Sequence, residues 1–344
     1  MEPDFYPVPR RMYHADGTAR FAFVTLLMLN DSYLPGVLML AHGLRKQRTR
    51  ADLVCLVSGD ITRSARSVLN RLFDRVIEVE KTFIPYGRTQ KRQHTPFVMT
   101  RLHALRLGAD GDLGCRYEKI ALLDADLLPL KNYDHLFTLN TPAGVINEHK
   151  THLLQYNRRG AYVFPPDLLR TGKWTWHRHY EPICPHGCPI PGRITNRVAH
   201  NPANMGIHGA VFVLTPAHRE FLAIQDDLHR PRTCRHIGES YPWPDMQYLT
   251  LRWSGRWTCV DLRFCGFRGY PRLSVLFGTH YAGIKPWQIH TSRTARRYAR
   301  FEDFKYWFRT FSGLTSIHHP ELLAHSRLKK LAQHIRDMQA VPAG

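Results

Sequence analysis

The segment 119–130, KIALLDADLLPL, restricts the fold of this chain more than any other stretch of its sequence. Its apolar run, residues 120–123, has the length and composition of a strand that is buried on both faces, and such strands belong to mainly parallel sheets. Two carboxylates, Asp124 and Asp126, follow the run directly. Ligands of open α/β sheets bind beyond the carboxyl ends of the strands, so these acids are expected in a site.

The chemistry of these two acids indicates what such a site would bind. Carboxylates in an apolar setting cost several kcal/mol unless a cation meets them. A divalent metal that carries a diphosphate meets this need, because Mg²⁺ and Mn²⁺ prefer carboxylate oxygens and share their coordination shell with phosphate. An Asp-x-Asp pattern is weak evidence by itself, since a turn at the end of a strand that caps the next helix has the same residues.

Length and composition indicate a globular protein. The 344 residues can bury the core of one large α/β domain, or of a domain with an appendage, and 43% of them are hydrophobic. The longest strongly apolar run, 21–29, is far shorter than the roughly 20 residues of a membrane span, and the N-terminal sequence lacks the pattern of a secretory signal. We therefore expect no membrane span and a cytoplasmic location, in which the seven scattered cysteines are reduced thiols.

The chain is strongly basic, with 48 Lys and Arg against 28 Asp and Glu, a net charge of +20. Many of these residues are dispersed, as on a solvated surface. Anionic partners such as nucleotide sugars, nucleic acid or acidic membranes would also explain the excess. Charge alone does not choose among these explanations.

The order of the expected elements predicts a parallel sheet wound with helices. After an irregular lead-in, strands are expected at 21–29, 53–57 and 75–79, alternating with helices at 33–44 and 62–73. A helix at 97–107 leads to the acid-bearing strand, and a helical turn at 134–137 and a strand at 143–146 follow it. The stretch 149–202 has little periodicity and is expected to be an insertion or a substrate-facing loop region.

The last part of the chain combines strands with amphipathic helices. We expect a strand at 208–214, helices at 216–227 and 244–253, and short strands and turns up to residue 277. Aromatic residues at helical spacing predict a helix at 300–311. A final helix is expected from Pro320, with Leu323, Leu328, Leu331 and Ile335 on one face. Both helices are expected to pack on the core.

Six segments in this order resemble glycogenin-like retaining glycosyltransferases of family 8: FVTLLMLNDSYLPG, MTRLHAL, ALLDADLLPL, HGAVFVLTP, DMQYLT and HYAGIKPW. The resemblance covers about residues 20–290 and implies an α/β fold of the GT-A type, a mainly parallel sheet flanked by helices. We accordingly expect a lead-in at 1–18, a GT-A domain at 19–290 and a C-terminal helical extension at 291–344. The implied activity is metal-dependent transfer of a hexose from a UDP-sugar, with Mn²⁺, or Mg²⁺ in its place.

The resemblance assigns roles to particular residues. Asp124, Asp126 and His280 match the metal ligands, and the mixture of imidazole and carboxylate suits Mn²⁺. Gly283 permits close approach of the backbone to phosphate, and Lys285 supplies a cation for the departing UDP. The remaining assignments are nucleotide contacts at Asn30, Tyr33 and Ala125, a charge at Arg101 for phosphate or sugar, and positioning of the sugar by Asp245.

Two departures from the family pattern affect the acceptor side. His208 stands where the family often has Asn, and Met246 stands where it has Gln, with Gln247 one place later. These changes leave the sugar open, and also the acceptor, which can be a glycan, a protein or a small molecule. Because members of the family often pair, a homodimer is a further expectation.

Three alternative interpretations remain open at this stage. A nucleic-acid-binding protein or nuclease would explain the charge but not the HYAGIKPW segment, and the basic residues form no recognisable nucleic-acid motif, so nucleic acid is not the expected partner. A noncatalytic, UDP-binding homologue agrees with the two departures. A zinc site could be built from Cys184, His186 and Cys188, with His177, His179, Cys234 and His236 elsewhere, although the Cys-x-x-x-Cys spacing is loose.

Overall fold

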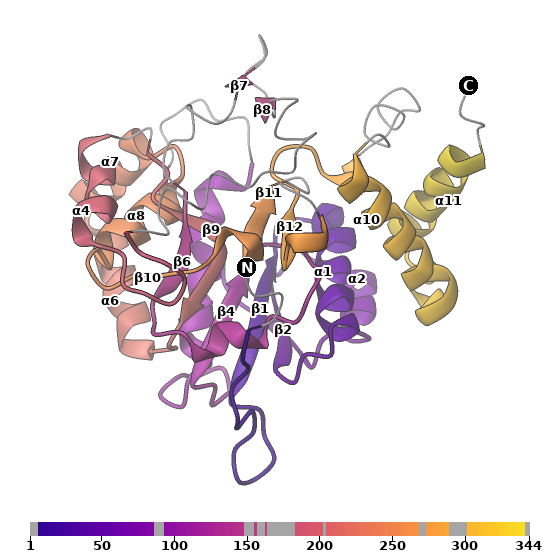
Figure 1. The fold of residues 1–344 in the computed structure, drawn as a ribbon, viewed down its shortest axis with the longest axis horizontal. Coiled ribbons are helices and arrows are strands. Elements are labelled where there is room, and N and C mark those ends of the chain that lie inside the picture. Colours follow the sequence, from indigo (N-terminus) through magenta and orange to yellow (C-terminus); the bar gives the residue numbers. More distant parts are fainter. Residues whose placement is uncertain are drawn as a thin grey trace.

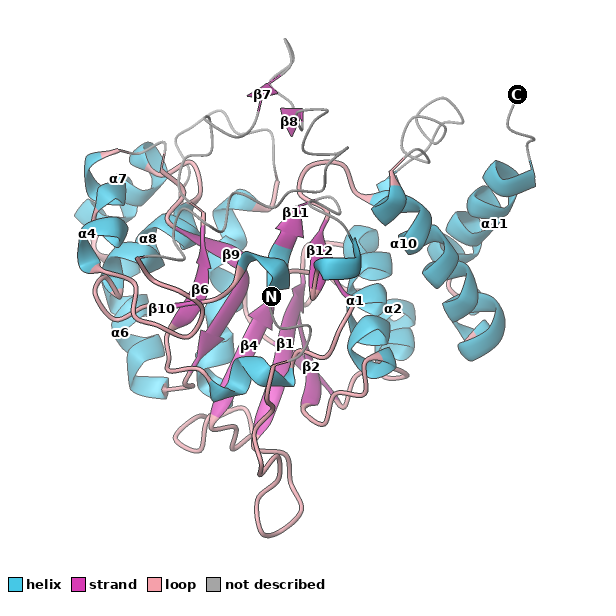
Figure 2. Ribbon diagram, viewed as in Figure 1, coloured by secondary structure: helices cyan, strands magenta, loops and turns pink. Residues whose placement is uncertain are grey.

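A computed structural model describes residues 6–85, 93–147, 183–201, 204–267, 273–288 and 301–340, together with the backbone of 155–156 and 162–163. Within these residues a seven-stranded sheet of order β10-β6-β9-β4-β1-β2-β3 forms the centre (Figures 1 and 2). Its strands are β1 (Phe21–Leu27), β2 (Asp52–Val57), β3 (Arg75–Glu78), β4 (Lys119–Leu123), β6 (Ala143–Ile146), β9 (Ile207–Leu214) and β10 (Thr258–Cys259). The expected α/β class with a mainly parallel sheet is confirmed.

The pairing of the strands brings several chain segments to one edge of the sheet. Strands β3, β2, β1 and β4 run parallel, whereas β9 is antiparallel to both β4 and β6. The carboxyl end of β4 therefore lies beside the amino end of β9, where the Asp124 N–H donates to the Ala210 carbonyl at 3.2 Å. Segments that follow β1 and β2 reach the same edge.

Helices cover both faces of the sheet (Figures 1 and 2). They are α1 (Leu34–Lys46), α2 (Arg63–Leu69), α4 (Gly192–Thr195), α5 (Arg197–His200), α6 (His218–His229), α7 (Pro231–Ser240), α8 (Pro244–Arg252), α10 (Glu302–Gly313) and α11 (Ser326–Ala340). The 3-10 helices are η1 (Asp31–Tyr33), η2 (Thr95–Leu107), η3 (Asp134–Thr138), η5 (Leu262–Cys265), η6 (Leu273–Val275), η7 (Pro286–Gln288) and η9 (Pro320–Ala324), and η8 (Leu314–His318) is a π-helix. Two-residue strands β7 (Gln155–Tyr156) and β8 (Tyr162–Val163) pair separately.

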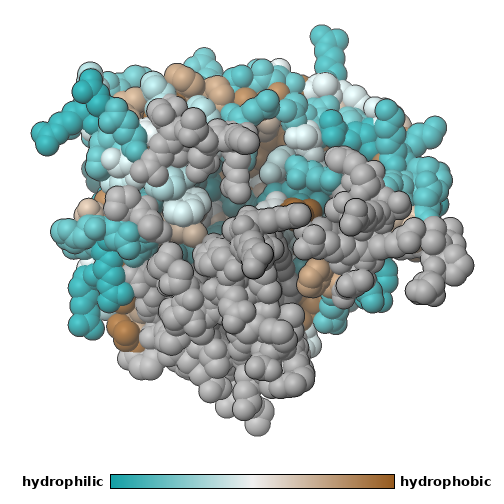
Figure 3. All heavy atoms as spheres, turned by 90° about the horizontal axis from the view of Figure 1, so that it is seen from above, coloured by the Kyte–Doolittle hydropathy of each residue, from teal (hydrophilic) through white to brown (hydrophobic). Residues whose placement is uncertain are grey.

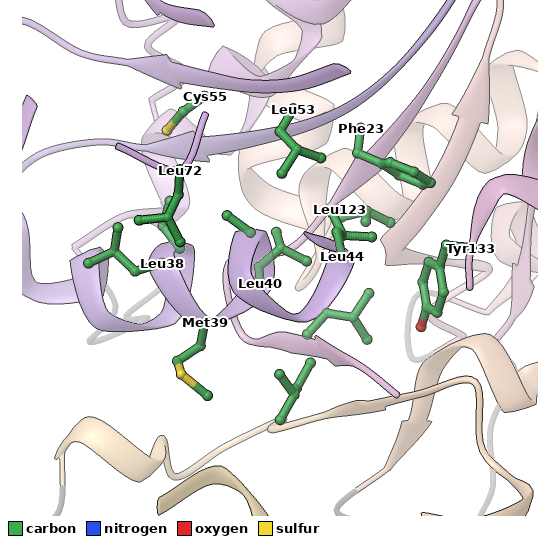
Figure 4. Packing of buried hydrophobic residues seen from close by; sticks show 14 of the residues in the cluster. Phe23, Leu38, Met39, Leu40, Leu44, Leu53, Cys55, Leu72, Leu123 and Tyr133 are labelled. Atoms are coloured by element: carbon green, nitrogen blue, oxygen red, sulfur yellow. The ribbon is translucent and has the colours of Figure 1, made fainter. Parts of the chain in front are cut away.

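Alternation along the strands divides the core in two. In β1, Phe21, Phe23 and Leu27 belong to a cluster with α1, α2 and the C-terminal helices. Ala22 and Val24 belong to the opposite cluster, with residues of η2, α6 and α8. Figure 4 shows the first of these faces, where side chains of α1 pack on those of β1, β2 and β4. Successive strand residues point to opposite faces, so a strand covered on both sides is apolar throughout.

A small second sheet, of order β11-β12-β5, was not predicted. It consists of β5 (Leu127–Pro129), β11 (Gly266–Phe267) and β12 (Gly278–His280), with β5 and β12 antiparallel. The short strands expected up to residue 277 include the position of β11, but β5 and β12 were not expected, because strands of two or three residues are too short to show an alternating pattern.

Some predicted helices differ from those observed. The helix expected at 97–107 is the 3-10 helix η2, because apolar spacing over a few turns does not distinguish the two hydrogen-bond patterns. The final helix is broken into η9 and α11, and Leu322 rather than Leu323 is fully buried. Helix α7 was not predicted, and most of the expected insertion at 149–202 lies outside the described residues.

The C-terminal helices join the core of the sheet domain. Phe304, Trp307, Phe308 and Phe311 of α10 are buried in the same cluster as β1 and α1.

The division of the chain into segments 1–18, 19–290 and 291–344 stays a prediction. In the part of the chain that the structure describes, no helix combines the length and apolar character needed to cross a membrane. Seen from above, the described residues around the rim are mainly hydrophilic (Figure 3).

Three histidines, His42, His103 and His186, make stability depend on pH. Burial, together with nearby His318, Arg106 and His135 respectively, lowers the pKa of each to about 4. The unfolded chain protonates histidine below about 6.5, so between about pH 6.5 and about 4 the unfolded state binds more protons. We expect the free energy of unfolding to fall as the pH drops through this window, measured by urea denaturation from pH 8 to 5.

Matched variants test whether these histidines cause the fall in the free energy of unfolding with decreasing pH. His42→Gln should reduce the fall in stability with decreasing pH, whereas His229→Gln, at an exposed position of α6, should leave it unchanged. A stability that is flat from pH 7 to 5 in the wild type would contradict the expectation.

Candidate active site

The candidate site is built on the turn that follows β4. The turn is closed by the Leu127 N–H, which donates to the Asp124 carbonyl at 3.1 Å before β5 begins. Asp126 is buried, whereas the side chain of Asp124 is 32% exposed to solvent. One carboxylate therefore needs compensation from the protein, while the other can reach a ligand.

Two cationic groups balance Asp126. Lys285 donates from Nζ to Oδ2, and His280 Nε2 lies 3.1 Å from Oδ1. Burial opposes ionisation, but Lys285 and His280 hold the pKa of Asp126 well below its ordinary value. Burial likewise acts against protonated His280, yet Asp126 raises the pKa of His280 to about 10. Asp126 is thus a carboxylate and, within the protein, His280 is its charged partner.

The small sheet explains how His280 and Lys285 reach these acids. His280 pairs with Leu127 across β12 and β5, and the Tyr281 N–H donates to the Asp126 carbonyl at 2.9 Å. Gly283 then has φ +88°, a conformation that other residues adopt only with strain. The resulting turn lets Lys285 fold back and donate from Nζ to the Tyr281 carbonyl at 2.8 Å.

Arg101 of η2 connects the remaining acids. Its Nη2 lies 3.1 Å from Asp124 Oδ1, and its Nη1 lies 3.1 Å from Asp245 Oδ2 at the start of α8. Nη2 also donates to the Gly209 carbonyl at 2.6 Å. Burial raises the pKa of Asp245, and Arg101 opposes that shift. The guanidinium fork therefore fixes two carboxylates and a backbone carbonyl in one arrangement.

The donor atoms at this site suit a divalent metal. One oxygen each from Asp124 and Asp126 and one ring nitrogen of His280 all lie within 4.8 Å of one another. Two carboxylates with one imidazole form a set that Mn²⁺ binds readily and that leaves coordination positions for a ligand. The structure thus brings the three predicted ligands together, with Lys285 and Arg101 beside them.

The predicted nucleotide contacts lie on the neighbouring segment. Asn30 Oδ1 accepts from the Ser32 N–H at 2.8 Å and so caps η1, while the Tyr33 ring contacts Trp287 edge-on at 5.5 Å. Ala125 is near this segment through Gly36, where an added Cβ would lie 2.4 Å from both the Ala125 carbonyl oxygen and the Trp287 ring. Their roles as ligand contacts stay predictions.

Two glycines with a function in the site were missed by sequence reasoning. Gly36 permits α1 to approach the acid-bearing turn. Gly209 permits Arg101 to approach β9, since a Cβ there would lie 3.0 Å from Arg101 Nη1 and 3.4 Å from Asp245 Oδ2. Both belong to the motifs quoted above, but their need for a small residue depends on contacts between segments far apart in the chain.

The departures at 246 and 247 have distinct structural consequences. Met246 is buried, and its Cγ lies near Gly209, next to Arg101 and Asp245. Gln247 does not take over its position, because its Oε1 accepts from the Trp243 N–H and its Nε2 donates to the Asn204 carbonyl. Gln247 therefore holds the start of α8.

The alternative zinc cluster is not assembled among the described residues. Two groups of candidate ligands occur there, Asp124-Asp126-His280 and His208-Cys265-His280. His186 instead uses Nδ1 to accept from the Asp261 N–H, and its Nε2 lies 2.8 Å from His135 Nε2. His177 and His179 lie outside the described residues.

Sequence comparisons identify relatives over part or most of the chain, although no family model matches it. The uncharacterised protein R707 of Acanthamoeba polyphaga mimivirus is 26% identical over 247 residues, 71% of each chain. Human glycogenin-1 is 36% identical over 121 residues, 34% of this chain and 32% of its own. Galactinol synthase 4 of Arabidopsis thaliana is 31% identical over 121 residues, 35% of this chain and 34% of its own. The chain thus matches about a third of the length of these last two relatives.

These relatives confirm the resemblance to glycogenin-like glycosyltransferases over a domain. Among solved structures, galactosyltransferase LgtC in complex with donor and acceptor sugar analogues is 13% identical, covers 83% of this chain and 99% of its own, and has a TM-score of 0.49. That score is too low to assign a fold by itself. The strand order and the sequence relatives together confirm the expected GT-A-type fold.

Replacing Arg101 by Met should destabilise the fold, because it leaves the buried Asp245 carboxylate without its partner. We expect the free energy of unfolding to fall by about 3 kcal/mol or more, measured by chemical denaturation. The double variant Arg101→Met with Asp245→Asn should recover part of this loss. No recovery would mean that Arg101 stabilises through Gly209 or packing rather than through charge.

Proposed function

We propose that this protein is a metal-dependent retaining glycosyltransferase that transfers a hexose from a UDP-sugar to an acceptor. The observation that carries the proposal is the cluster of Asp124, Asp126 and His280 beside Lys285, at the ligand-binding edge of a mainly parallel sheet. Similarity to glycogenin and galactinol synthase, whose names indicate glycosyl chemistry, supports it. Retention of configuration comes from the resemblance to glycogenin-like enzymes.

The metal would be held by Asp124, Asp126 and His280, with Mn²⁺ preferred over Mg²⁺ because one ligand is an imidazole. When bound, it supplies a Lewis acid for the diphosphate. Lys285 is the nearest protein cation to Asp126, and its Nζ can stabilise negative charge on the departing UDP. Gly283, without a side chain, permits close approach of the phosphate to the backbone.

Arg101 and Asp245 position the sugar in this proposal. Both are almost fully buried and bonded to each other, so they form a rigid polar wall beside Asp124. Preorganised groups of this kind orient a substrate without a further cost in ordering. Asn30, Tyr33 and Ala125 are proposed to contact the nucleotide from the segments that follow β1 and β4.

The acceptor side of the site is the least conventional part. Met246 places an apolar chain beside Arg101 and Asp245, where the resemblance leads us to expect an amide. That substitution favours a second candidate function, a noncatalytic protein that binds UDP and metal without transfer.

We also propose a cytoplasmic location and a homodimer for this glycosyltransferase.

Purified protein incubated with a panel of UDP-, GDP- and other nucleotide sugars tests the proposal through nucleotide release. We expect Mn²⁺-dependent release from one UDP-sugar, abolished by EDTA and by Asp126→Ala, because the alanine removes one metal ligand. UDP binding without release would favour the noncatalytic candidate. Neither release nor UDP binding would refute both and bring nucleic acid forward as a partner.

A matched control distinguishes a local effect from a general one. Asp60 follows β2 at the same edge and pairs with Lys81 at 2.6 Å, as Asp126 pairs with Lys285. Asp60→Ala should retain Mn²⁺-dependent UDP binding, while Asp126→Ala should lose it with the fold intact by circular dichroism. Equal Mn²⁺-dependent UDP binding by the two variants would contradict the assignment of Asp126 as a metal ligand.

Lys285→Ala should lower turnover more than donor binding if Nζ acts mainly on the leaving group. Removing one preorganised donor of this kind costs about a hundred-fold in turnover. Turnover and the UDP dissociation constant are measured for this variant and for Lys81→Ala as its control. Equal losses in turnover and binding for Lys285→Ala would mean that Lys285 binds phosphate in the ground state instead.

A further inference from the structure

Behind the proposed metal ligand His280 lies a second group of buried side chains. A ring nitrogen of His280, the Cys265 Sγ and a ring nitrogen of His208 lie within 4.8 Å of one another, and all three residues are buried. The His208 and His280 rings meet edge-on, with centroids 4.9 Å apart. Because His280 Nε2 is directed at the carboxylates, we infer that the nitrogen on this side is Nδ1.

His280 Nδ1 needs an acceptor from this group. This nitrogen is buried, since His280 is only 5% exposed, and within the described parts of the chain it makes no hydrogen bond of ordinary length. A buried, unbonded ring N–H would cost about 1–3 kcal/mol. Among the side chains of the cluster, Cys265 offers sulfur lone pairs.

The hydrogen bonds of His208 determine the direction of the donors. The Ala210 N–H donates to His208 Nδ1 at 2.9 Å, so this nitrogen is an acceptor and carries no proton. Cys265 Sγ lies 3.8 Å from the same nitrogen, so the thiol proton can share that lone pair with the Ala210 N–H. The sulfur lone pairs are then available to accept from His280 Nδ1–H.

We propose that Cys265 is a positioning residue for the metal site, holding His280 with its proton on Nδ1 and its lone pair on Nε2, toward the cation. The inference rests on the proposed function and gives a role to Cys265, to which the sequence pattern assigned none. Hydrogen-bond acceptors behind imidazole ligands orient them and fix their tautomer, and their loss costs about 10- to 100-fold in metal affinity; because a thiol sulfur is a weak acceptor, the lower end of this range applies to Cys265. The polar chain runs from Ala210 N–H and His208 through Cys265 to His280.

The fold explains why Cys265 occupies this place. It ends η5, directly before β11, and β11 pairs in parallel with β12, so that Phe267 lies beside His280. The strand that carries the metal ligand is thus flanked on one side by β5, with the acidic turn, and on the other by the segment with the thiol.

The experiment measures Mn²⁺ binding directly, from the loss of the free-ion EPR signal, without nucleotide or sugar. We expect Cys265→Ala to weaken Mn²⁺ binding about ten-fold or more. Cys265→Ser, which retains a donor and an acceptor, should recover most of the affinity. Cys55→Ala, which removes a buried thiol in β2, is the matched control and should bind as the wild type does. Equal affinity of Cys265→Ala and the wild type would overturn the proposal.

A second measurement uses the wild type and therefore tests the proposal even if the Cys265→Ala variant does not fold. Nitrogen NMR of ¹⁵N-histidine-labelled protein with Mg²⁺ should show His280 protonated on Nδ1 only, and His208 unprotonated on Nδ1. A His280 protonated on Nε2 in the metal-bound protein would refute the proposal. Absence of Mn²⁺ and Mg²⁺ binding by the wild type would refute the proposed metal site itself, which separates the two failures.

Discussion

The burial of acidic groups at the end of β4 is the constraint on which the rest of the site depends. Asp124, Asp126 and Asp245 meet Arg101, Lys285 and His280, so that three carboxylates face three groups that carry or accept positive charge. A dication added to such a balanced cluster creates excess positive charge in a region of low dielectric constant, which costs free energy. A diphosphate that arrives with the metal removes this excess. If the site binds a metal, the electrostatics therefore make a diphosphate tighten the metal binding beyond what the protein ligands achieve alone.

Completion of the site requires a segment that is itself held by the C-terminal helices. Tyr281 Oη donates to the Asp303 carbonyl at 2.8 Å, and the Trp287 ring lies 5.8 Å from that of Trp307 in α10. His280 and Lys285 stand on either side of Tyr281 and before Trp287, so these contacts set the position of both. The aromatic stripe of α10 thus has a role in the site beyond stabilising the core, because it fixes the backbone that carries the proposed metal ligand His280 and the proposed phosphate-binding cation Lys285.

Sequence reasoning succeeded where a residue's role follows from its neighbours in the chain. The apolar runs of β1 and β4 and the acids after β4 are local patterns, and they predicted the sheet and a site at its edge, whereas the grouping of His280 with Asp124 and Asp126 was implied by the resemblance of six segments to a known family. It failed where the role follows from contacts between distant segments. Strands β5 and β12 are too short to show periodicity. Gly36, Gly209 and Cys265 are explained only by what lies against them, namely Trp287, Arg101 and His280, and no spacing in the sequence records those contacts.

The strong positive charge of the chain has to be explained outside this site. Charges within the candidate site cancel, so the excess of +20 is carried by other residues. Among the described residues several surface acids are already paired with a base, for example Glu118 with Arg20, Asp74 with Arg45, and Asp112 with Arg106, so these acids do not offset the remaining bases. Under the proposed function, an excess of this sign would raise the local concentration of an anionic nucleotide sugar, an effect that salt screens within about 10 Å at 0.1 M ionic strength. Under the proposed function, the balanced buried cluster and the basic excess would serve different steps, the first holding the donor and the second attracting it.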